Sequence, residues 1–338
     1  MKKKSVLIVG PFRSTFTRND AELFSQSGWH VRKLDADIGR GLRGLMALVK
    51  SVFVAIPRVW SSDCVFCWFA DYATLAPALL ARLFGKRVLV VACGFDVTNM
   101  PEYNTGAILK PARWFFTRNT FKLATKIFPV SDFAKRCLVE LLPDAVHKAV
   151  TVHNCIFFDR FATAGCVSKR EIALTVNQAD NLNDYRIKGM PEFIELASRM
   201  PHVRFVLAGL RSVALREAQR AGGSLPNLSI IPGPLSQKVE LIPLFYSAHT
   251  YCQPSHFESF GLAVAEAMAC GCVPCTSNNG AIPEIVTSEG YRGDSYSDWM
   301  SIIEKATSAS DEERSQIRNS VRRFDVEARR AKLLREME

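Results

Sequence analysis

Two carboxylates, Glu258 and Glu266, could bind the two ends of one ligand, and the second is set in unusual surroundings. The stretch from Phe260 to Cys270 is small and apolar on every side, and Gly271 follows it. A helix without a polar stripe is expected to be buried all round, with the glycine as its stop. An unpaired carboxylate inside it would be costly, so Glu266 must have a partner. Glu258 lies just ahead of the helix N-terminus, where free backbone N–H groups favour anions.

The spacing of the two acids limits the chemistry they can do together. With about 1.5 Å of rise per residue, the carboxylates of Glu258 and Glu266 would stand roughly 12 Å apart. A glycosidase pair needs about 5 to 9.5 Å. The spacing suits two separate acceptors that hold hydroxyls at the two ends of an extended ligand, with a phosphate on the helix tip between them. A nucleoside diphosphate sugar has that form. A second interpretation stays open, in which Glu266 forms an ion pair in the core and Glu258 is a loop acid.

Two cations, Arg186 and Lys188, come directly before Gly189 and a helical pattern over 190–199. This order predicts a basic loop at the start of a helix. Fixed cations and helix N-terminal amides are what a departing diphosphate needs, because its negative charge grows as the sugar bond breaks. A solvated basic loop is the other interpretation of these two residues.

The residues around these groups resemble those of a known family. The run PSHFESFGLAVAEAMACGCVPCTSNNGAIPEIV, residues 254–286, resembles the donor-site signature of retaining family 4 glycosyltransferases of the GT-B architecture. The run DYRIKGMPEFIELASRMPHVRFVLAG, residues 184–209, is similar to the segment where that family places an Arg and a Lys on the donor diphosphate. The resemblance covers the C-terminal half well and the N-terminal half loosely. It implies an α/β fold of two Rossmann-like parallel-sheet domains that face each other across a cleft.

The resemblance also implies a role for each candidate residue. Glu266 would accept from the ribose hydroxyls, Glu258 from hydroxyls of the transferred sugar, and Lys188 with Arg186 would hold the diphosphate. The catalytic candidates are thus Glu258, Lys188 and Arg186, and the donor-binding candidates are Glu266, Ser259, Phe260, Gly261 and Leu262.

Asp96 occupies the region that faces the acceptor in the family, where a His is common. A contact from Asp96 to the acceptor or the sugar is one expectation for this residue. A structural role for this acid in a turn is the other.

The activity so implied is retaining, metal-independent transfer of a sugar from a UDP- or GDP-linked donor. The acceptor would be a saccharide or a lipid-linked molecule in surface polysaccharide or glycolipid synthesis. No cofactor is expected, and no metal, since the fixed cations would serve in its place. A sugar-nucleotide epimerase or phosphorylase of the same architecture remains an alternative, as does a non-catalytic basic binding protein.

The charge of the chain is concentrated in its first half. Residues 1–160 hold 23 Lys and Arg against 12 Asp and Glu, whereas residues 161–338 hold 20 against 21. Such asymmetry indicates an anionic partner surface, such as lipid headgroups or a lipid-phosphate acceptor. Nucleic acid is not expected as a partner, because a nucleic-acid adaptor would not explain a carboxylate on an apolar helix.

The ten cysteines indicate a reducing compartment. They are scattered along a chain too long to need a disulfide framework. Cys64 and Cys67, like Cys272 and Cys275, have metal-like spacing, but no paired motif with nearby His completes a zinc site. No apolar run reaches the roughly eighteen residues of a spanning helix. We expect a cytoplasmic protein, peripheral on the inner face of the plasma membrane.

The length and the alternation of apolar runs with helical patterns predict two parallel-sheet domains. We expect an acceptor-binding domain over 1–160, a nucleotide-sugar-binding domain over 161–315, and a C-terminal helix over 316–338 that returns to the first domain. The expected strands are Val6–Val9, His30–Leu34, Cys64–Phe69, Arg87–Ala92, Lys126–Val130, Val150–Cys155, Glu171–Val176, Val203–Ala208, Leu228–Pro232 and Thr250–Gln253.

One basic and apolar segment has two interpretations. Residues 40–58 hold a helical pattern from about Leu42 to Ile56 flanked by arginines. It is either a crossover helix packed on the sheet, with its cations extended to solvent, or a helix that lies partly in an anionic leaflet.

Overall fold

The chain forms two α/β units, each built on a parallel sheet. The computed structural model describes residues 3–35, 52–162 and 171–337. The first unit consists of Met1–Cys155 together with Val326–Glu338, and the second of Ile156–Asp325. The predicted class, two parallel-sheet α/β domains, is confirmed.

The sheet of the first unit has the strand order β2-β1-β3-β4-β5, with every described pairing parallel. Strands β1 and β3 are buried along their whole length, which is why their sequences are continuously apolar rather than alternating. The strands are β1 (Ser5–Gly10), β2 (His30–Asp35), β3 (Cys64–Trp68), β4 (Arg87–Ala92) and β5 (Lys126–Pro129).

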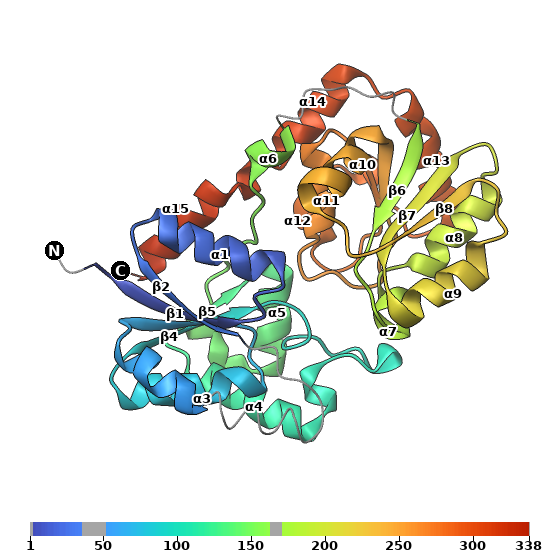
Figure 1. Ribbon diagram of the computed structural model, residues 1–338. Coiled ribbons are helices and arrows are strands. Elements are labelled where there is room, and N and C mark those ends of the chain that lie inside the picture. The colour runs from blue at the N-terminus through green and yellow to red at the C-terminus, as the bar shows by residue number, and fades with distance from the viewer. Residues whose placement is uncertain (1–2, 36–51, 163–170, 338) are drawn as a thin grey trace. The chain divides into compact units, whose positions relative to one another are not determined.

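Helices cover both faces of this sheet. Helices α1 and α15 lie on one face and α3 and α4 on the other (Figure 1). The helices are α1 (Thr15–Gln26), a helical segment over 52–60, α3 (Tyr72–Leu83), α4 (Pro111–Leu123), α5 (Asp132–Leu141) and α15 (Val326–Met337).

A buried ion pair attaches α15 to the rest of the first unit. Arg329 on α15 donates from Nε and Nη2 to the two carboxylate oxygens of Asp20 on α1, at 2.7 and 2.8 Å. Their side chains are 1% and 0% exposed. Arg329 also donates to the backbone oxygens of Val152 and His153, at 3.0 and 2.7 Å. The guanidinium thus satisfies a carboxylate and two carbonyls that water cannot reach.

The sheet of the second unit has the order β10-β9-β6-β7-β8, again with parallel pairings. On one face, β6, β7 and β9 pack against α8, α9 and α13 through a core that includes Phe193, Phe205 and Ile303. The strands are β6 (Ile172–Val176), β7 (Arg204–Leu210), β8 (Leu228–Pro232), β9 (Ala248–Gln253) and β10 (Val273–Thr276).

The other face of this sheet is covered by α10 and α11, with Phe245 of α10 against Tyr251 of β9 at a ring distance of 5.7 Å. The helices of the second unit are α6 (Phe158–Ala162), α7 (Leu182–Ile187), α8 (Met190–Arg199), α9 (Ser212–Gly222), α10 (Ile242–Ser247), α11 (Leu262–Ala269), α12 (Ile282–Ile285), α13 (Tyr296–Thr307) and α14 (Asp311–Ser320).

The strand predicted over Val150–Cys155 is wrong. The N–H groups of Val150 and Val152 do donate to Ile127 and Pro129 of β5, each at 2.9 Å, but only an isolated bridge at Ala149 results. The carbonyl groups of Val152 and His153 accept from Arg329 instead of from a neighbouring strand. The stretch is extended beside β5 without completing a ladder.

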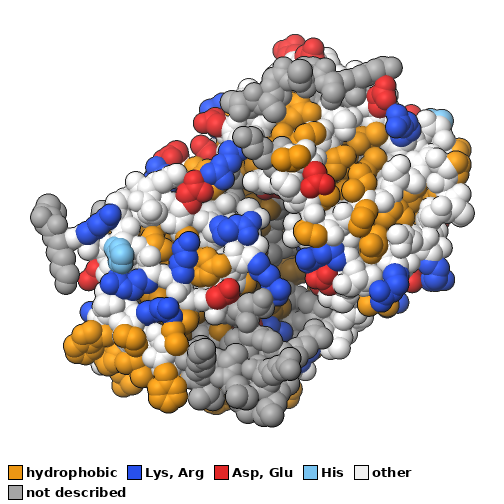
Figure 2. All heavy atoms as spheres, viewed as in Figure 1, with side chains coloured by type: hydrophobic (Ala, Val, Ile, Leu, Met, Phe, Trp, Pro, Cys, Tyr) orange, Lys and Arg blue, Asp and Glu red, His pale blue; other side chains and the backbone are white. Residues whose placement is uncertain are grey.

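The surface of the first unit carries the basic excess that the sequence indicates, with Lys and Arg side chains over much of the visible face (Figure 2). Most of the basic apolar segment 40–58 lies outside the described residues, and only its last turns, within the helical segment 52–60, are described. Among the described residues no helix is both long and apolar enough to cross a membrane.

Candidate donor site in the second unit

The second sheet reverses its strand order between β6 and β9. The chain runs from β6 outward through β7 to β8, and then continues with β9 on the other side of β6. In open α/β sheets, ligands bind at the carboxyl ends of the strands where the order reverses. Tyr251 joins the two strands at this point, because its hydroxyl accepts from the backbone N–H of Val176 at 3.4 Å. The predicted donor residues lie on the loops that leave this edge.

Glu258 is held on this edge by two side chains. Lys188 donates from Nζ to Oε1 of Glu258 at 2.6 Å, and Gln253 donates from Nε2 to the same oxygen. The side chain of Glu258 is 8% exposed and that of Lys188 is 32% exposed. The structure thus brings together two candidates that are 70 residues apart in the sequence. A buried carboxylate with two donors on one oxygen is fixed in orientation. No hydrogen bond from a described residue reaches the second oxygen, which can accept from a ligand hydroxyl.

Two glycines make the contact between these loops close enough. Gly189 has φ +71°, and a Cβ there would lie 2.1 Å from the carbonyl oxygen of Pro254. Gly280 has φ +67°, and a Cβ there would lie 2.2 Å from the carbonyl oxygen of Glu258. Both positions need a left-handed backbone and the absence of a side chain. They press the Lys188 turn against residues 254–256 and fix the backbone of Glu258.

Helix α11 begins at Leu262 and is buried from Val264 to Ala269, as its apolar sequence predicts. Glu266 is 9% exposed, and its described contact is a long hydrogen bond of 3.5 Å from Nε2 of Gln237. Among the side chains that the structure describes, none forms an ion pair with Glu266. The 12 Å spacing assumed helical rise from Glu258 onward, and that assumption is wrong, because residues 258–261 are not helical.

Burial raises the pKa of Glu266 to about 8, with a small opposing effect of the Gln237 hydrogen bond. The carboxyl group's ordinary pKa is 4.5. Between these values the folded protein holds a proton that the unfolded chain has released, so the free energy of unfolding falls as the pH rises. The ligand-free protein therefore carries an acid whose ionised form would be stabilised by hydroxyl donors.

We expect Glu266→Gln to remove this pH dependence. The melting temperature of the variant, relative to the wild type, should rise between about pH 4.5 and about pH 8 and stay level above that, because the amide has no proton to lose. Thermal unfolding without ligand at several pH values measures the difference. Glu289→Gln, which changes an exposed acid of the same unit, is the control and should show no such trend. A difference for Glu266→Gln that is independent of pH would contradict the raised pKa.

The loop before α11 holds the remaining donor candidates. Phe260 is 2% exposed and packs edge-on against Phe324, with ring centroids 5.3 Å apart. Gly261 caps the helix with φ +100°, and Ser259 and Leu262 are partly exposed. Backbone N–H groups in the first turn of a helix have no partner within it. Amides at such a position suit an anion, and the role of these residues in donor binding stays a prediction.

Arg186 differs from its predicted setting. It lies within α7, a short helix whose N-cap Asn181 accepts from the N–H of Asp184 at 2.9 Å, and not in a loop. Arg186 is exposed. The pKa of Glu217 on α9 is lowered mainly by a hydrogen bond from Arg220, and the charge of Arg186 lowers it further. In the part of the chain that is described, Arg186 makes no hydrogen bond to Glu258. Lys188, at the C-cap of α7, does.

Asp96 is buried in the first unit, at 1% exposure. Its Oδ2 accepts from the N–H of Ala70 at 3.2 Å and its Oδ1 from the N–H of Cys93 at 3.1 Å. Burial raises its pKa to about 7, against the lowering effect of these backbone hydrogen bonds. Both carboxylate oxygens thus bind backbone N–H groups of two loops at the carboxyl edge of the first sheet. These contacts correspond to the second of the two expectations for Asp96, a structural role in a turn.

Two residues of the donor site were not singled out from the sequence, Tyr251 and Gln253. The hydroxyl of Tyr251 donates to the side-chain oxygen of Gln253 at 3.0 Å, and Gln253 in turn donates to Glu258. Both residues are buried, at 0% and 4% exposure. The sequence held one indication of this role, the polar amide of Gln253 at the end of the buried strand β9. A buried amide at that position needs hydrogen-bond partners at the ligand-binding edge.

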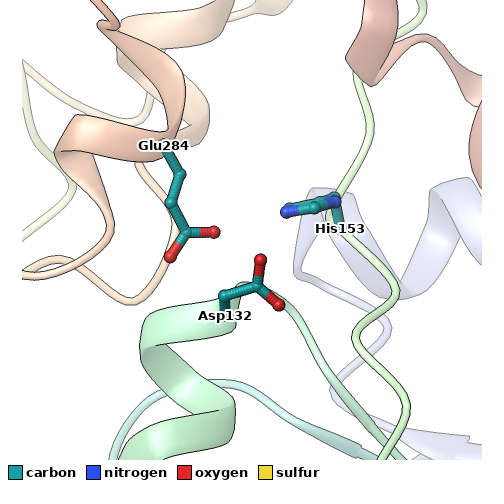
Figure 3. Close-up of side chains that lie close together, drawn as sticks. All are labelled: Asp132, His153 and Glu284. Atoms are coloured by element: carbon teal, nitrogen blue, oxygen red, sulfur yellow. The ribbon is translucent and has the colours of Figure 1, made fainter.

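Groups with metal-ligand chemistry do not form a site within either unit in the described ranges. Figure 3 shows Asp132 and His153, which belong to the first unit, and Glu284, which belongs to the second. Asp132 begins α5 and accepts from the hydroxyl of Thr151 at 2.6 Å. Burial raises the pKa of Cys64 and Cys67 to about 12, which disfavours the thiolate that binds metals.

The candidate residues lie in a part of the chain that resembles a known family of domains. Residues 168–330 match the family model described as Glycosyl transferases group 1. The matched segment, just under half of the chain, is thus similar to glycosyl transferases group 1 domains. A curated relative, O-antigen chain mannosyltransferase B from Escherichia coli, is 41% identical over 51 residues, which is 15% of this chain and 13% of the relative.

Solved structures match the fold over nearly the whole chain. A glycosyltransferase from Rickettsia africae superposes with a TM-score of 0.76 at 16% identity, over 99% of this chain and 98% of that one. A sucrose-phosphate synthase from Thermosynechococcus elongatus gives 0.78 at 15% identity, over 99% of both chains. The Anabaena protein HepE, in complex with UDP and glucose, gives 0.73 at 13% identity, over 98% of both chains. At these identities the likeness shows the GT-B fold.

Proposed function

We propose that the protein is a retaining, metal-independent glycosyltransferase that moves a sugar from a UDP- or GDP-linked donor to a saccharide or lipid-linked acceptor. The observation that carries the proposal is the contact of Lys188 with Glu258 at the strand-order reversal of a glycosyl transferases group 1 domain. The donor binds the second unit and the acceptor binds the first. The reaction serves surface polysaccharide or glycolipid synthesis.

In the proposed chemistry, each site residue binds a different part of the donor. Glu266 accepts from the ribose hydroxyls, and the free oxygen of Glu258 accepts from a hydroxyl of the transferred sugar. The amides at the start of α11, together with Lys188, stabilise the charge that grows on the diphosphate. The acceptor oxygen attacks the anomeric carbon on the face that the diphosphate leaves, and a phosphate oxygen takes the acceptor's proton. Tyr251 and Gln253 keep Glu258 in place throughout.

The location that accompanies this proposal is cytoplasmic and peripheral to a membrane. Large apolar side chains of the first unit are exposed, among them Phe53 and Trp60 at 68% each and Leu83 at 70%, and the basic excess of the chain lies in the same half of the sequence. Aromatic and basic side chains on one surface favour an anionic leaflet. The lipid-linked acceptor class is consistent with such a surface.

A nucleotide screen tests the proposed donor site. UDP or GDP should raise the melting temperature of the wild-type protein, because a ligand that binds only the folded state stabilises it by mass action. Glu266→Ala should weaken that nucleotide by about 10- to 100-fold, which corresponds to about 1.5–3 kcal/mol for hydrogen bonds to a charged group. Titration calorimetry measures the change, and Glu289→Ala, at an exposed acid, is the control.

Turnover separates the candidate reactions. Release of UDP or GDP from a nucleotide sugar only when an acceptor is present supports transfer. Conversion of the donor to another sugar nucleotide without an acceptor would identify an epimerase instead. Absence of binding by every nucleotide and nucleotide sugar would contradict the proposal, and would favour the non-catalytic binding protein.

A further inference from the structure

The first sheet also reverses its strand order, and the reversal lies between β1 and β3. The chain passes from β1 to β2 on one side and then to β3 on the other. By the rule that places ligands at such reversals, the carboxyl ends of β1 and β3 mark a binding position in this unit. The two ends approach closely, since a Cβ on Gly10 would lie 2.8 Å from Cβ of Trp68. The side chains that leave this edge are aromatic.

Three partly exposed phenylalanines surround this point, Phe16, Phe69 and Phe95. Phe69 follows β3 directly and stacks on Phe95, with centroids 5.3 Å apart and planes at 29°. Phe16, from α1, meets Phe69 edge-on at 5.6 Å. Rings on three separate elements converge on one position without being fully buried. A core cluster would exclude them from solvent, so this arrangement indicates a surface for a ligand with an apolar face.

The backbone of Phe69 is held in a conformation that this residue type avoids. Its φ is +67°, in the left-handed region. Its N–H donates to Val91 at 3.1 Å, and the next residue, Ala70, is held on both sides by Asp96 and by the hydroxyl of Thr117, which donates to its carbonyl at 2.8 Å. Surroundings that force a strained conformation in this way are common at binding sites. Here these contacts fix the direction of the Phe69 ring. The buried Asp96 contributes by holding the N–H of Ala70, the residue that follows Phe69.

A planar charged pair borders the aromatic surface. Arg113 donates to both carboxylate oxygens of Asp71, at 3.0 and 2.6 Å, and its guanidinium lies 3.9 Å from the centroid of Phe95. The side chains of Arg113 and Asp71 are 28% and 24% exposed. The pair therefore offers donors and acceptors in a fixed plane beside the rings.

We propose that Phe69, Phe95 and Phe16 form a stacking surface for a pyranose ring of a saccharide acceptor, with Arg113 and Asp71 at the sugar hydroxyls. One face of a pyranose presents C–H bonds, whose partial positive charge complements the negative face of an aromatic ring. Its rim presents hydroxyls, which both donate and accept and so match a paired guanidinium and carboxylate. The saccharide site itself stands on these contacts alone, and only its role as acceptor site rests on the proposed function.

Binding to the whole protein can be measured without turnover. Saturation-transfer NMR with methyl α-D-mannopyranoside, methyl α-D-glucopyranoside and methyl β-D-galactopyranoside should show transfer to the ring C–H protons of at least one. Phe69→Gly should weaken that binding by about two- to tenfold, the loss expected for one aromatic contact. The glycine accepts the left-handed backbone, so this variant should melt no lower than the wild type. Phe115→Ala, which removes a 60% exposed phenylalanine of α4, should bind as the wild type does.

Three outcomes would overturn the proposal. They are the absence of transfer to all three pyranosides, equal binding by Phe69→Gly and the wild type, and transfer to octyl β-D-glucopyranoside confined to its octyl chain. The last would identify a lipid-binding surface. Nucleotide binding, measured by thermal shift, should be the same in Phe69→Gly as in the wild type. Failure of nucleotide binding with intact pyranoside binding would contradict the proposed function and leave the saccharide site standing.

Discussion

Lys188→Ala is expected to lower kcat by about 10²- to 10³-fold, the loss typical of one positioned group that stabilises transition-state charge. Lys188 has two tasks in the proposed site, since its ammonium neutralises the diphosphate and holds Oε1 of Glu258 at 2.6 Å. Initial rates of nucleotide release with a nucleotide sugar and an acceptor measure the loss. Lys305→Ala, at an exposed lysine of α13, should retain the wild-type rate.

Two further variants make this expectation sharper. Glu258→Gln should reduce kcat to a similar degree, because an amide cannot accept from Lys188, Gln253 and a sugar hydroxyl together. Arg186→Ala should cost less than Lys188→Ala, because Arg186 is exposed on α7 and has no described contact with Glu258. A wild-type rate in both Lys188→Ala and Glu258→Gln would remove the assignment of the catalytic site. An equal loss in Arg186→Ala would show that the diphosphate reaches that side of α7.

Arg329→Ala is expected to destabilise the first unit by about 3–5 kcal/mol, the cost of leaving a buried charge without its partner. The variant removes the counter-charge of Asp20 and the donors to the carbonyls of Val152 and His153. Urea unfolding followed by tryptophan fluorescence suits the test, because four of the five tryptophans lie in residues 1–155. The midpoint of the first unit's transition should fall, while that of the second unit should not.

The neighbouring Arg330 provides the matched control. It also lies on α15 and pairs with Gln26 and with Glu327, whose side chain is 62% exposed while that of Arg330 is 23% exposed. Arg330→Ala should therefore cost less than about 1 kcal/mol. The double variant Asp20→Ala/Arg329→Ala should lose less than the sum of the single changes, because neither charge is then left alone. Equal losses in Arg329→Ala and Arg330→Ala would contradict the role of the buried pair.

Most of the fold followed from local sequence, and its exceptions have physical causes. Strand β4 and helix α8 have the predicted limits, because a continuous apolar run marks a strand buried in a parallel sheet and helical periodicity marks a helix packed on it. Strand β8 also has the predicted limits, although it is an edge strand whose residues are all partly or fully exposed. The strand expected over Val150–Cys155 failed because its carbonyls bind an arginine from the far end of the chain. A contact between residues so far apart in the sequence does not change the local pattern of apolar and polar residues, so it cannot be predicted from that pattern.

The candidate site was predictable in its residue types and less so in its connections. Glu258, Glu266 and Lys188 were selected from their motifs, and their roles stay predictions. That Lys188 meets Glu258 could not be read from spacing, since the glycine contacts that bring the loops together are tertiary. The relay from Tyr251 through Gln253 was missed because two ordinary strand residues acquire partners only in the folded sheet. The short helix around Arg186 was missed, although Asn181, three residues ahead of Asp184, is a capping signal.

The interrupted first unit has a consequence for synthesis on the ribosome. Asp20 emerges early, and its arginine partner follows 309 residues later. At about 5–20 residues per second this interval lasts roughly 15–60 s, long enough for residues 156–325 to emerge completely. The nascent N-terminal part must therefore wait with an unneutralised aspartate, whereas the inserted part is continuous and can mature first. Synthesis of α15, Val326–Met337, is the step that completes the first unit.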